Sequence, residues 1–131
     1  MMILNLTQHQ ATAAQLAAGV IDLPDEKRTA LIDALTVTTL PDRESIEARC
    51  DYIAELACQN GLGDDETDDP HPRMAMIGGA PWLMSTLEQA LTERGITPLY
   101  AFSVRESTER TLPDGTVQKI NVFKHAGFVG L

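Results

Sequence analysis

The sequence predicts a single α/β domain with a mainly parallel sheet and an antiparallel hairpin at its C-terminal end. Between Met74 and Phe102 an apolar segment, a helical segment and a second strand-like segment follow one another. A strand–helix–strand unit of this kind requires parallel pairing of its two strands. Further along, the turn signal Pro113-Asp114-Gly115 separates two strand-like segments, which predicts that they pair as an antiparallel hairpin.

Length and composition restrict the class of protein. The chain has 131 residues, 44% of them hydrophobic, which suits one globular domain spanning residues 1–131. No apolar run approaches the ~20 residues of a membrane span, and residues 1–6 lack the features of a signal peptide. We therefore expect a cytoplasmic protein without a membrane partner. The net charge of -9 also argues against duplex nucleic acid as a partner, because that binding depends on neutralising phosphates.

The first part of the chain predicts two short strands and three helices. Ile3–Leu6 and Val20–Leu23 are short apolar segments bounded by polar residues. Thr12 is a suitable N-cap for a helix over residues 13–18, which Gly19 would end. Two longer helices are expected, one from Asp25 to about Leu35 and one from Arg43 to Gln59 that Asp42 caps.

The second part of the chain continues the alternation of strands and helices. The strand Met74–Ile77 ends in two glycines, and a helix with an apolar stripe follows from Pro81 to Arg94. The strand Leu99–Glu106 alternates apolar and polar side chains, and Val117–Phe123 is its return strand. With the N-terminal elements, this order predicts a Rossmann-like three-layer sandwich whose hairpin lies at one side of the sheet.

The sequence contains no pattern typical of a metal or cofactor site. Residues 61–73 are expected to form an exposed, mobile acidic loop, but the run Asp64–Asp69 lacks the ligand spacing of a calcium loop. The histidines and cysteines give no zinc spacing, and the dinucleotide and phosphate-loop fingerprints are absent. Cys50 and Cys58 would lie about 12 Å apart on one helix, too far for a disulfide. We expect reduced cysteines, no metal and no cofactor.

Ligands of open α/β sheets bind beyond the carboxyl ends of the parallel strands. Two polar or glycine segments follow predicted strands directly, namely 7–9 and 78–79, and a third lies late in the strand Leu99–Glu106. These segments contribute the candidate site residues Thr7, Gln8, His9, Gly78, Gly79, Ser103 and Arg105.

Each candidate role has an ordinary structural alternative. Gly78 and Gly79 would let a phosphate approach a helix N-terminus, or they simply make a tight strand-to-helix turn. His9 has the chemistry of a general acid or base, or it is a surface histidine. Arg105 shares a face with Ser103 and would bind a phosphate in bidentate fashion, or it pairs with a neighbouring carboxylate.

The segment Asn5-Leu6-Thr7-Gln8-His9, the glycine turn and the late strand with Ser103-Val104-Arg105-Glu106 resemble those of small CRISPR-associated Rossmann-fold (CARF-like) proteins. Those proteins sense or cleave cyclic oligoadenylate. The resemblance implies a homodimer that binds the cyclic nucleotide across its two-fold axis. Some of those proteins are metal-independent ring nucleases, in which a ribose 2′-hydroxyl attacks the neighbouring phosphate.

The same resemblance assigns roles to residues of this chain. Thr7 and Gln8 would line the ligand, Gly78 and Gly79 would admit a phosphate, and Ser103 would contact the ring. His9 would transfer a proton and Arg105 would stabilise charge. The alternative is a non-enzymatic protein, either a nucleotide-binding regulator or sponge or an interaction module of a phage or defence locus, because one fold hosts many functions.

Overall fold

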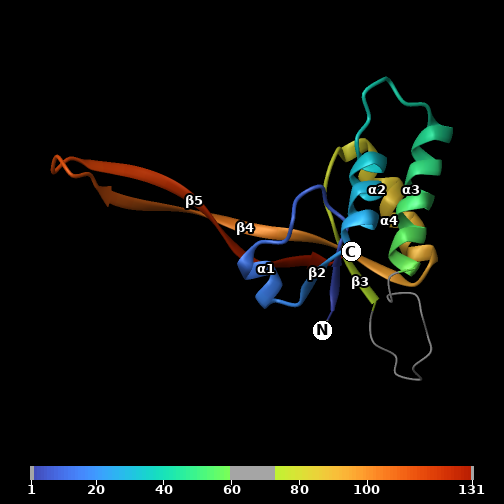
Figure 1. Ribbon diagram of the computed structural model, residues 1–131, viewed down its shortest axis with the longest axis horizontal. Coiled ribbons are helices and arrows are strands. Elements are labelled where there is room, and N and C mark those ends of the chain that lie inside the picture. The colour runs from blue at the N-terminus through green and yellow to red at the C-terminus, as the bar shows by residue number, and fades with distance from the viewer. Residues whose placement is uncertain (1, 60–72, 131) are drawn as a thin grey trace.

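The computed structural model describes residues 2–59 and 73–130, and Figure 1 shows the arrangement of their helices and strands. A five-stranded sheet has the order β2-β1-β3-β4-β5. The pairs β1–β2, β1–β3 and β3–β4 are parallel, and β4–β5 is antiparallel. The predicted α/β class, the mostly parallel sheet and the C-terminal hairpin at its edge are therefore confirmed. The strands are β1 (Ile3–Asn5), β2 (Val20–Asp22), β3 (Arg73–Ile77), β4 (Ile96–Thr111) and β5 (Val117–Gly130).

Local signals in the sequence account for where the helices begin. Thr12 caps the first helix in a capping box with Gln15, and Asp42 caps the third helix by accepting a hydrogen bond from the Ser45 N–H at 2.8 Å. Pro81 occupies the first turn of the last helix, where its missing N–H costs no internal hydrogen bond. The helices are α1 (Ala13–Ala17), α2 (Asp25–Leu35), α3 (Arg43–Ala57) and α4 (Pro81–Glu93).

The two faces of the sheet are covered unequally. On one face, α2, α3 and α4 bury the main core, which includes Leu31, Ile53 and Leu87 against sheet residues such as Ile77. On the other face a smaller cluster forms around Ile3, Val20, Met76 and Leu99. Figure 1 shows α1 on this second side, and none of the side chains of α1 is buried. The described residues thus form one full helical layer and one thin layer.

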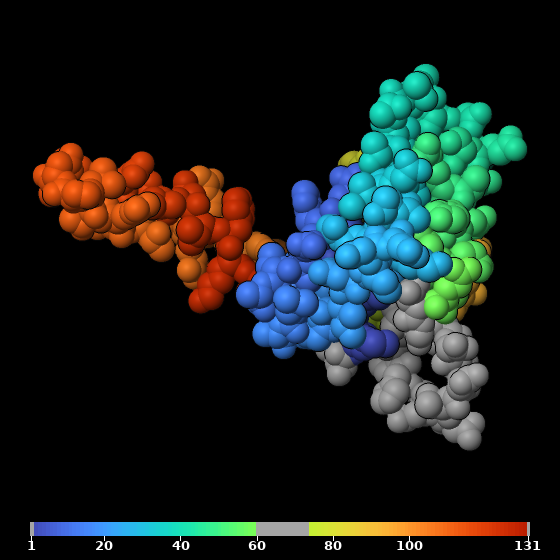
Figure 2. Space-filling view, in the orientation of Figure 1, coloured from blue at the N-terminus to red at the C-terminus, as the bar shows by residue number. Residues whose placement is uncertain are grey.

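The C-terminal hairpin is longer than its apolar pattern predicts. β3 pairs with β4 only as far as Tyr100, yet β4 and β5 stay paired out to Thr111 and Val117. Residues 102–129, which we call the arm, therefore project from the rest of the molecule as a two-stranded ribbon, seen in orange and red in Figure 2. The outer residues of β4, 107–111, are all polar, so they lack the alternation of apolar and polar side chains by which a strand is recognised.

Several sequence-based boundaries shift in the structure. Arg73, which we assigned to the acidic loop, is the first residue of β3. The rest of that segment, residues 61–72 with Asp64–Asp69, lies outside the described residues. Cys50 is buried and Cys58 is partly exposed, and neither is bonded to another cysteine. None of the helices in the described ranges combines the length and the apolar composition needed to cross a bilayer.

Candidate functional site

A cavity of about 570 Å³ opens at the carboxyl ends of β1 and β3, beside the point where β4 leaves the sheet. The predicted residues Thr7, Gln8 and His9 come from the loop after β1, and Gly78 and Gly79 from the loop after β3. The structure therefore brings these residues together where an α/β sheet usually binds its ligand. The remaining lining residues are Gln10, Thr12, Gln15, Met76, Ile77, Tyr100 and Ala101.

Asn5 organises the loop after β1. Its side chain is 3% exposed, and its amide donates hydrogen bonds to the His9 carbonyl at 2.8 Å and to the Asp22 carboxylate at 2.7 Å. Its carbonyl oxygen accepts from the Thr7 N–H at 2.9 Å and from the Thr7 hydroxyl at 2.7 Å. All the hydrogen-bonding capacity of a buried amide is thus used to shape this loop.

Two charged side chains extend this support. The Asp22 carboxylate on β2 also accepts from the Ala11 N–H at 3.0 Å, and the Arg28 guanidinium on α2 donates to the Gln8 carbonyl at 3.0 Å. Both contacts fix the backbone beside the cavity. Asn5 and Asp22 are not among the site residues predicted from the sequence. Each is a polar residue at the end of a short apolar strand, and this position is the feature of the sequence that could have indicated a supporting role.

These contacts decide which side chains of the cavity remain free. The single proton of the Thr7 hydroxyl is shared between the Asn5 side-chain oxygen at 2.7 Å and the His9 carbonyl at 3.1 Å, so only the lone pairs of this hydroxyl can serve a ligand. The Tyr100 hydroxyl donates to the Glu88 carboxylate at 2.5 Å. Burial raises the pKa of Tyr100, and the hydrogen bond to Glu88 and its charge raise it further, so this phenol stays neutral. His9 is exposed and is the remaining titratable side chain of the lining.

The two glycines of the β3 loop differ in what they require. Gly79 has a φ of +155°, and a Cβ at this position would lie 3.3 Å from the Met84 Cε. A Cβ at Gly78 would lie 3.6 Å from the Thr7 Cγ2, which is an ordinary contact. A tight turn therefore explains Gly79 by itself, whereas Gly78 leaves room next to Thr7 at the cavity wall.

Ser103 and Arg105 do not line this cavity. Both are exposed on the arm, where Ser103 pairs with His125 and Arg105 with Phe123. They lie on the same face of β4 as Ala101, which does line the cavity, as the alternation of side chains predicts. Arg105 is roughly 13 Å beyond Ala101 at about 3.3 Å per residue. The structure thus places these two residues along a surface that leads away from the cavity.

His125 is a further polar group near this surface that the sequence analysis did not select. Its Nδ1 is buried without a hydrogen-bond partner, and its ring meets the edge of Phe128 with centroids 5.0 Å apart. Its place across from Ser103 follows from a register shift between Phe102 and Ser103. An irregularity of this kind leaves no signal in the sequence alone.

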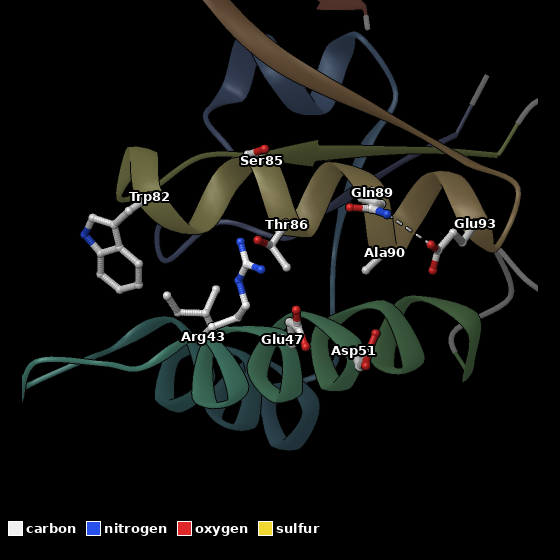
Figure 3. Close-up of a pocket in the computed structure, with 10 residues that line it drawn as sticks. Arg43, Glu47, Asp51, Trp82, Ser85, Thr86, Gln89, Ala90 and Glu93 are labelled. Carbon is white, nitrogen blue, oxygen red and sulfur yellow. Dashed lines mark hydrogen bonds between the residues drawn. The ribbon is translucent and has the colours of Figure 1, made fainter.

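A second cavity, of about 590 Å³, lies between α3 and α4 (Figure 3). Arg43 extends across it toward Thr86, while the carboxylates of Glu47, Asp51 and Glu93 also line it. Three carboxylates against one guanidinium make this groove unsuitable for a phosphate group. The cavity at the strand ends is therefore the better candidate for an anionic ligand.

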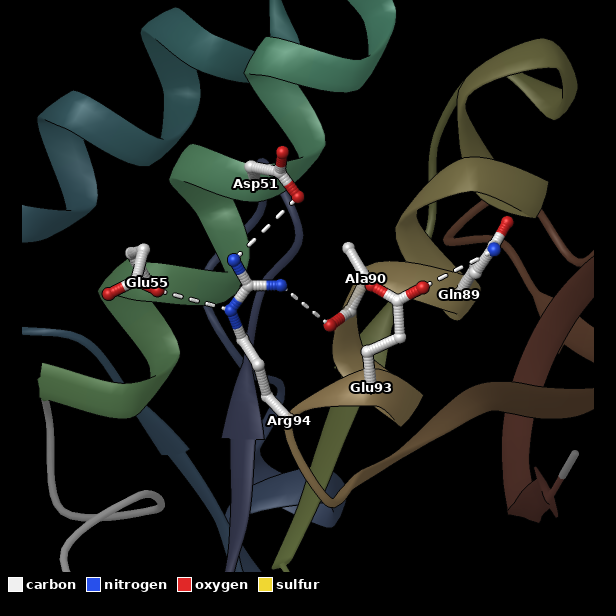
Figure 4. A network of polar contacts seen from close by, with 6 residues as sticks. All are labelled: Asp51, Glu55, Gln89, Ala90, Glu93 and Arg94. Atoms are coloured by element: carbon white, nitrogen blue, oxygen red, sulfur yellow. Dashed lines mark hydrogen bonds and ion pairs between the residues drawn. The ribbon is translucent and has the colours of Figure 1, made fainter.

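Arg94 lies between the end of α4 and α3, next to residues that line the second cavity (Figure 4). Its guanidinium bonds to the Glu55 carboxylate at 3.2 Å, to the Ala90 carbonyl at 2.9 Å and to Asp51 at 3.7 Å. These contacts join the end of α4 to α3, which is a structural role. The part of the chain that the structure describes contains no group of three or more His, Cys, Asp or Glu side chains placed to hold a metal ion.

Comparison with known proteins links the whole arrangement to one family. No curated protein and no solved structure matches the chain. A family model described as the Uncharacterized protein MJ1673 family matches residues 1–129, which include the sheet, both loops of the cavity and the arm. The chain belongs to the MJ1673 family.

Proposed function

We propose that the protein is a homodimer that binds a small phosphate-bearing nucleotide, of the class of cyclic oligonucleotide second messengers, and cleaves it without a metal ion. The observation that supports this proposal is the cavity at the carboxyl ends of β1 and β3. Thr7, Gln8 and His9 line it together with Gly78 and Gly79. Such a position, with few charges and several polar groups, is typical of nucleotide sites in α/β proteins.

The spacing of the polar groups favours an oligonucleotide over a mononucleotide. Among the described residues that line the cavity there is no arginine or lysine, whereas Arg105 lies on the adjoining face of the arm. A ligand that contacts both has to span roughly 13 Å, which exceeds the reach of one nucleotide phosphate. We therefore assign Arg105 to a neighbouring phosphate of the same ligand, with Ser103 between the two sites.

In the cleavage reaction the attacking group is the ribose 2′-hydroxyl of the ligand itself. Its oxygen forms a bond to the adjacent phosphorus while the bond from phosphorus to the 5′-oxygen breaks, which leaves a 2′,3′-cyclic phosphate. His9 accepts the proton of the 2′-hydroxyl and returns it to the departing 5′-oxygen. Arg105, bound to the neighbouring phosphate, offsets the negative charge of the ligand.

A nucleotide-binding regulator or sponge is the second candidate. The hydroxyls of Thr7 and Tyr100 are already engaged in internal hydrogen bonds. His9 is then the single group of the lining that is available for proton transfer, which suits binding as well as it suits catalysis. In both cases we infer a Rossmann-like sandwich with α1 as its thin third layer, working in the cytoplasm, where the cysteines stay reduced.

Thermal shift with mono-, di- and cyclic oligonucleotides tests the proposal. A ligand at ~100 times its dissociation constant should stabilise the fold by about 2.7 kcal/mol. Arg105→Ala should weaken binding roughly ten- to hundredfold, because a charge-assisted contact is lost. Arg110→Ala is the matched control, since Arg110 lies on the opposite face of the same strand and should bind as the wild type does.

Chromatography of the bound nucleotide separates the two candidates. His9→Ala should abolish product formation with little loss of affinity if the protein is a nuclease. If the wild type binds the nucleotide and forms no product, the protein is a regulator or sponge. The site assignment is wrong if no nucleotide shifts the wild type, or if Arg105→Ala binds a ligand as tightly as the wild type.

A further inference from the structure

One face of the arm carries an exposed row of apolar side chains. The register of β4 and β5 puts Phe102, Val104, Ile120, Val122 and Val129 on the same face, which we call the apolar stripe. Phe102 is 52% exposed, Val129 47%, and Val104 and Val122 39% each. The stripe continues the sheet face that α4 covers at Tyr100, but it extends beyond the helix.

The arm is a two-stranded ribbon that the rest of the sheet does not support. Beyond Tyr100, β4 is paired only with β5, and Figure 1 shows the two strands projecting from the rest of the molecule. An isolated two-stranded ribbon is at best marginally stable in water. A contiguous exposed apolar surface is typical of an interface. The stripe is therefore expected to be covered when the protein is in its functional state.

The distribution of charge indicates what covers the stripe. The arm carries four basic and three acidic side chains, a net charge of +1, which leaves -10 for the rest of the chain out of the total of -9. Two copies would therefore repel each other strongly through their bodies, whereas the nearly neutral arms add little repulsion, which favours a contact between arms over a contact between bodies. Outside the arm, the exposed large hydrophobic side chains of the described residues are scattered over different elements: Met2, Leu16, Ile21, Leu40, Tyr52 and Trp82.

We propose that two copies of the chain associate by packing the apolar stripe of one arm on the apolar stripe of the other, about a two-fold axis. A two-fold interface uses the same patch on both copies, and the stripe supplies a row of apolar side chains for such a patch. On the other face, the exposed Val117 and Phe123 are separated by Lys119 and Asn121. Glu106 and Lys124 flank Val104 and Val122 on this face, so each copy presents both signs of charge beside the apolar contact. This inference rests on the homodimer of the proposed function and specifies its contact surface.

The arrangement keeps the candidate site open. Ser103, Arg105 and His125 lie on the opposite face of the arm, which is continuous with the cavity at Ala101. Packing the apolar stripes together leaves that opposite face, on which Phe123 lies across from Arg105, exposed to a ligand. The partner's arm then packs on the face of the arm opposite Arg105. This contact restricts the motion of the arm and so fixes Arg105 relative to the cavity of its own chain.

A charge-balanced pair of substitutions tests the interface. Val104→Glu with Val122→Lys puts two charges into the stripe, and each new side chain faces an opposite charge across the ribbon, at Lys124 and Glu106. Cross-strand pairs of opposite charge stabilise a hairpin, so the arm itself should persist. The matched control is Val117→Lys with Phe123→Glu, which makes the same exchange on the other face, at positions 58% and 76% exposed.

Sedimentation equilibrium over a range of protein concentrations gives the result. The wild type and the control should have twice the mass of the 14.3 kDa chain, and the stripe variant should have the mass of one chain, with a dimer dissociation constant raised at least a hundredfold. Circular dichroism checks the fold of each variant, and Val122→Lys alone replaces a double variant that does not fold. A monomeric wild type, or a stripe variant that remains dimeric, overturns the proposal.

The same proteins separate this proposal from the proposed function. If the stripe variant is monomeric but no nucleotide shifts any of the proteins, the interface stands and the nucleotide site is wrong. If the wild type is monomeric and still binds a nucleotide that Arg105→Ala does not bind, the site stands and the interface is wrong.

Discussion

Replacing Asn5 should destabilise the protein more than any other single polar substitution near the cavity. Asn5→Ala removes four hydrogen bonds from a side chain that is 3% exposed. Three of these bonds join neutral groups and contribute about 1 kcal/mol each, and the one to the Asp22 carboxylate contributes about 1.5–3 kcal/mol. Thr7 and His9 are partly accessible, so water recovers some of this loss. We expect a net decrease of about 3 kcal/mol in the free energy of unfolding.

Urea unfolding followed by circular dichroism measures this decrease. Thermal unfolding should show a melting temperature lower by roughly 10 °C for a chain of this size. Asp22→Asn should cost less, because an amide oxygen still accepts from Asn5 and from the Ala11 N–H. The matched control is Asn121→Ala on the arm, where an exposed asparagine accepts one hydrogen bond from Ser107 at 3.0 Å.

The loss of stability in Asn5→Ala has to exceed that in Asn121→Ala if the hydrogen bonds of Asn5 hold the loop after β1. Asn121→Ala should change the free energy of unfolding by less than about 0.5 kcal/mol, as exposed substitutions usually do. If Asn5→Ala is equally mild, the buried network does not hold the loop after β1. The loop would then have to be positioned by other contacts, and Asn5 would have no supporting role at the cavity.

Three further predictions concern other parts of the molecule. Gly79→Ala should lower the free energy of unfolding by about 1–3 kcal/mol, measured in urea, because φ is +155°, whereas Gly78→Ala should be nearly neutral. Arg94→Ala should lower the free energy of unfolding by about 1–2 kcal/mol. The difference between the variant and the wild type should be smaller in high salt, because salt screens the ion pairs to Asp51 and Glu55. Burial, with the Asp51 charge, raises the pKa of Cys50 from 9.0 to about 11, which disfavours the thiolate in the folded protein. The neutral Cys50 thiol therefore contributes fully to the free energy of unfolding below pH 9.0, and this contribution is lost as the pH rises toward about 11. Urea unfolding of Cys50→Ala between these pH values should lack this part of the pH dependence.

The order and type of the elements follow from local signals in the sequence. Helix caps at Thr12 and Asp42, the turn at Asp114-Gly115 and the strand–helix–strand unit around α4 are encoded by residues close together in the chain. Local signals of this kind act before any long-range contact forms, so they can be recognised without a structure. The same holds for the loops at the cavity, because parallel strands end at a common edge.

The division of the candidate site depends instead on contacts between residues that are far apart in the chain. The sequence grouped Arg105 with His9 because His9 follows a predicted strand and Arg105 lies late in another, but β4 runs past the edge of the sheet and carries Arg105 out along the arm. The support from Asn5 to Asp22 joins β1 to β2, which depends on strand pairing rather than on spacing in the chain. Strand length, register and contacts between elements are set by packing across the whole fold, and a local pattern of residues does not contain them.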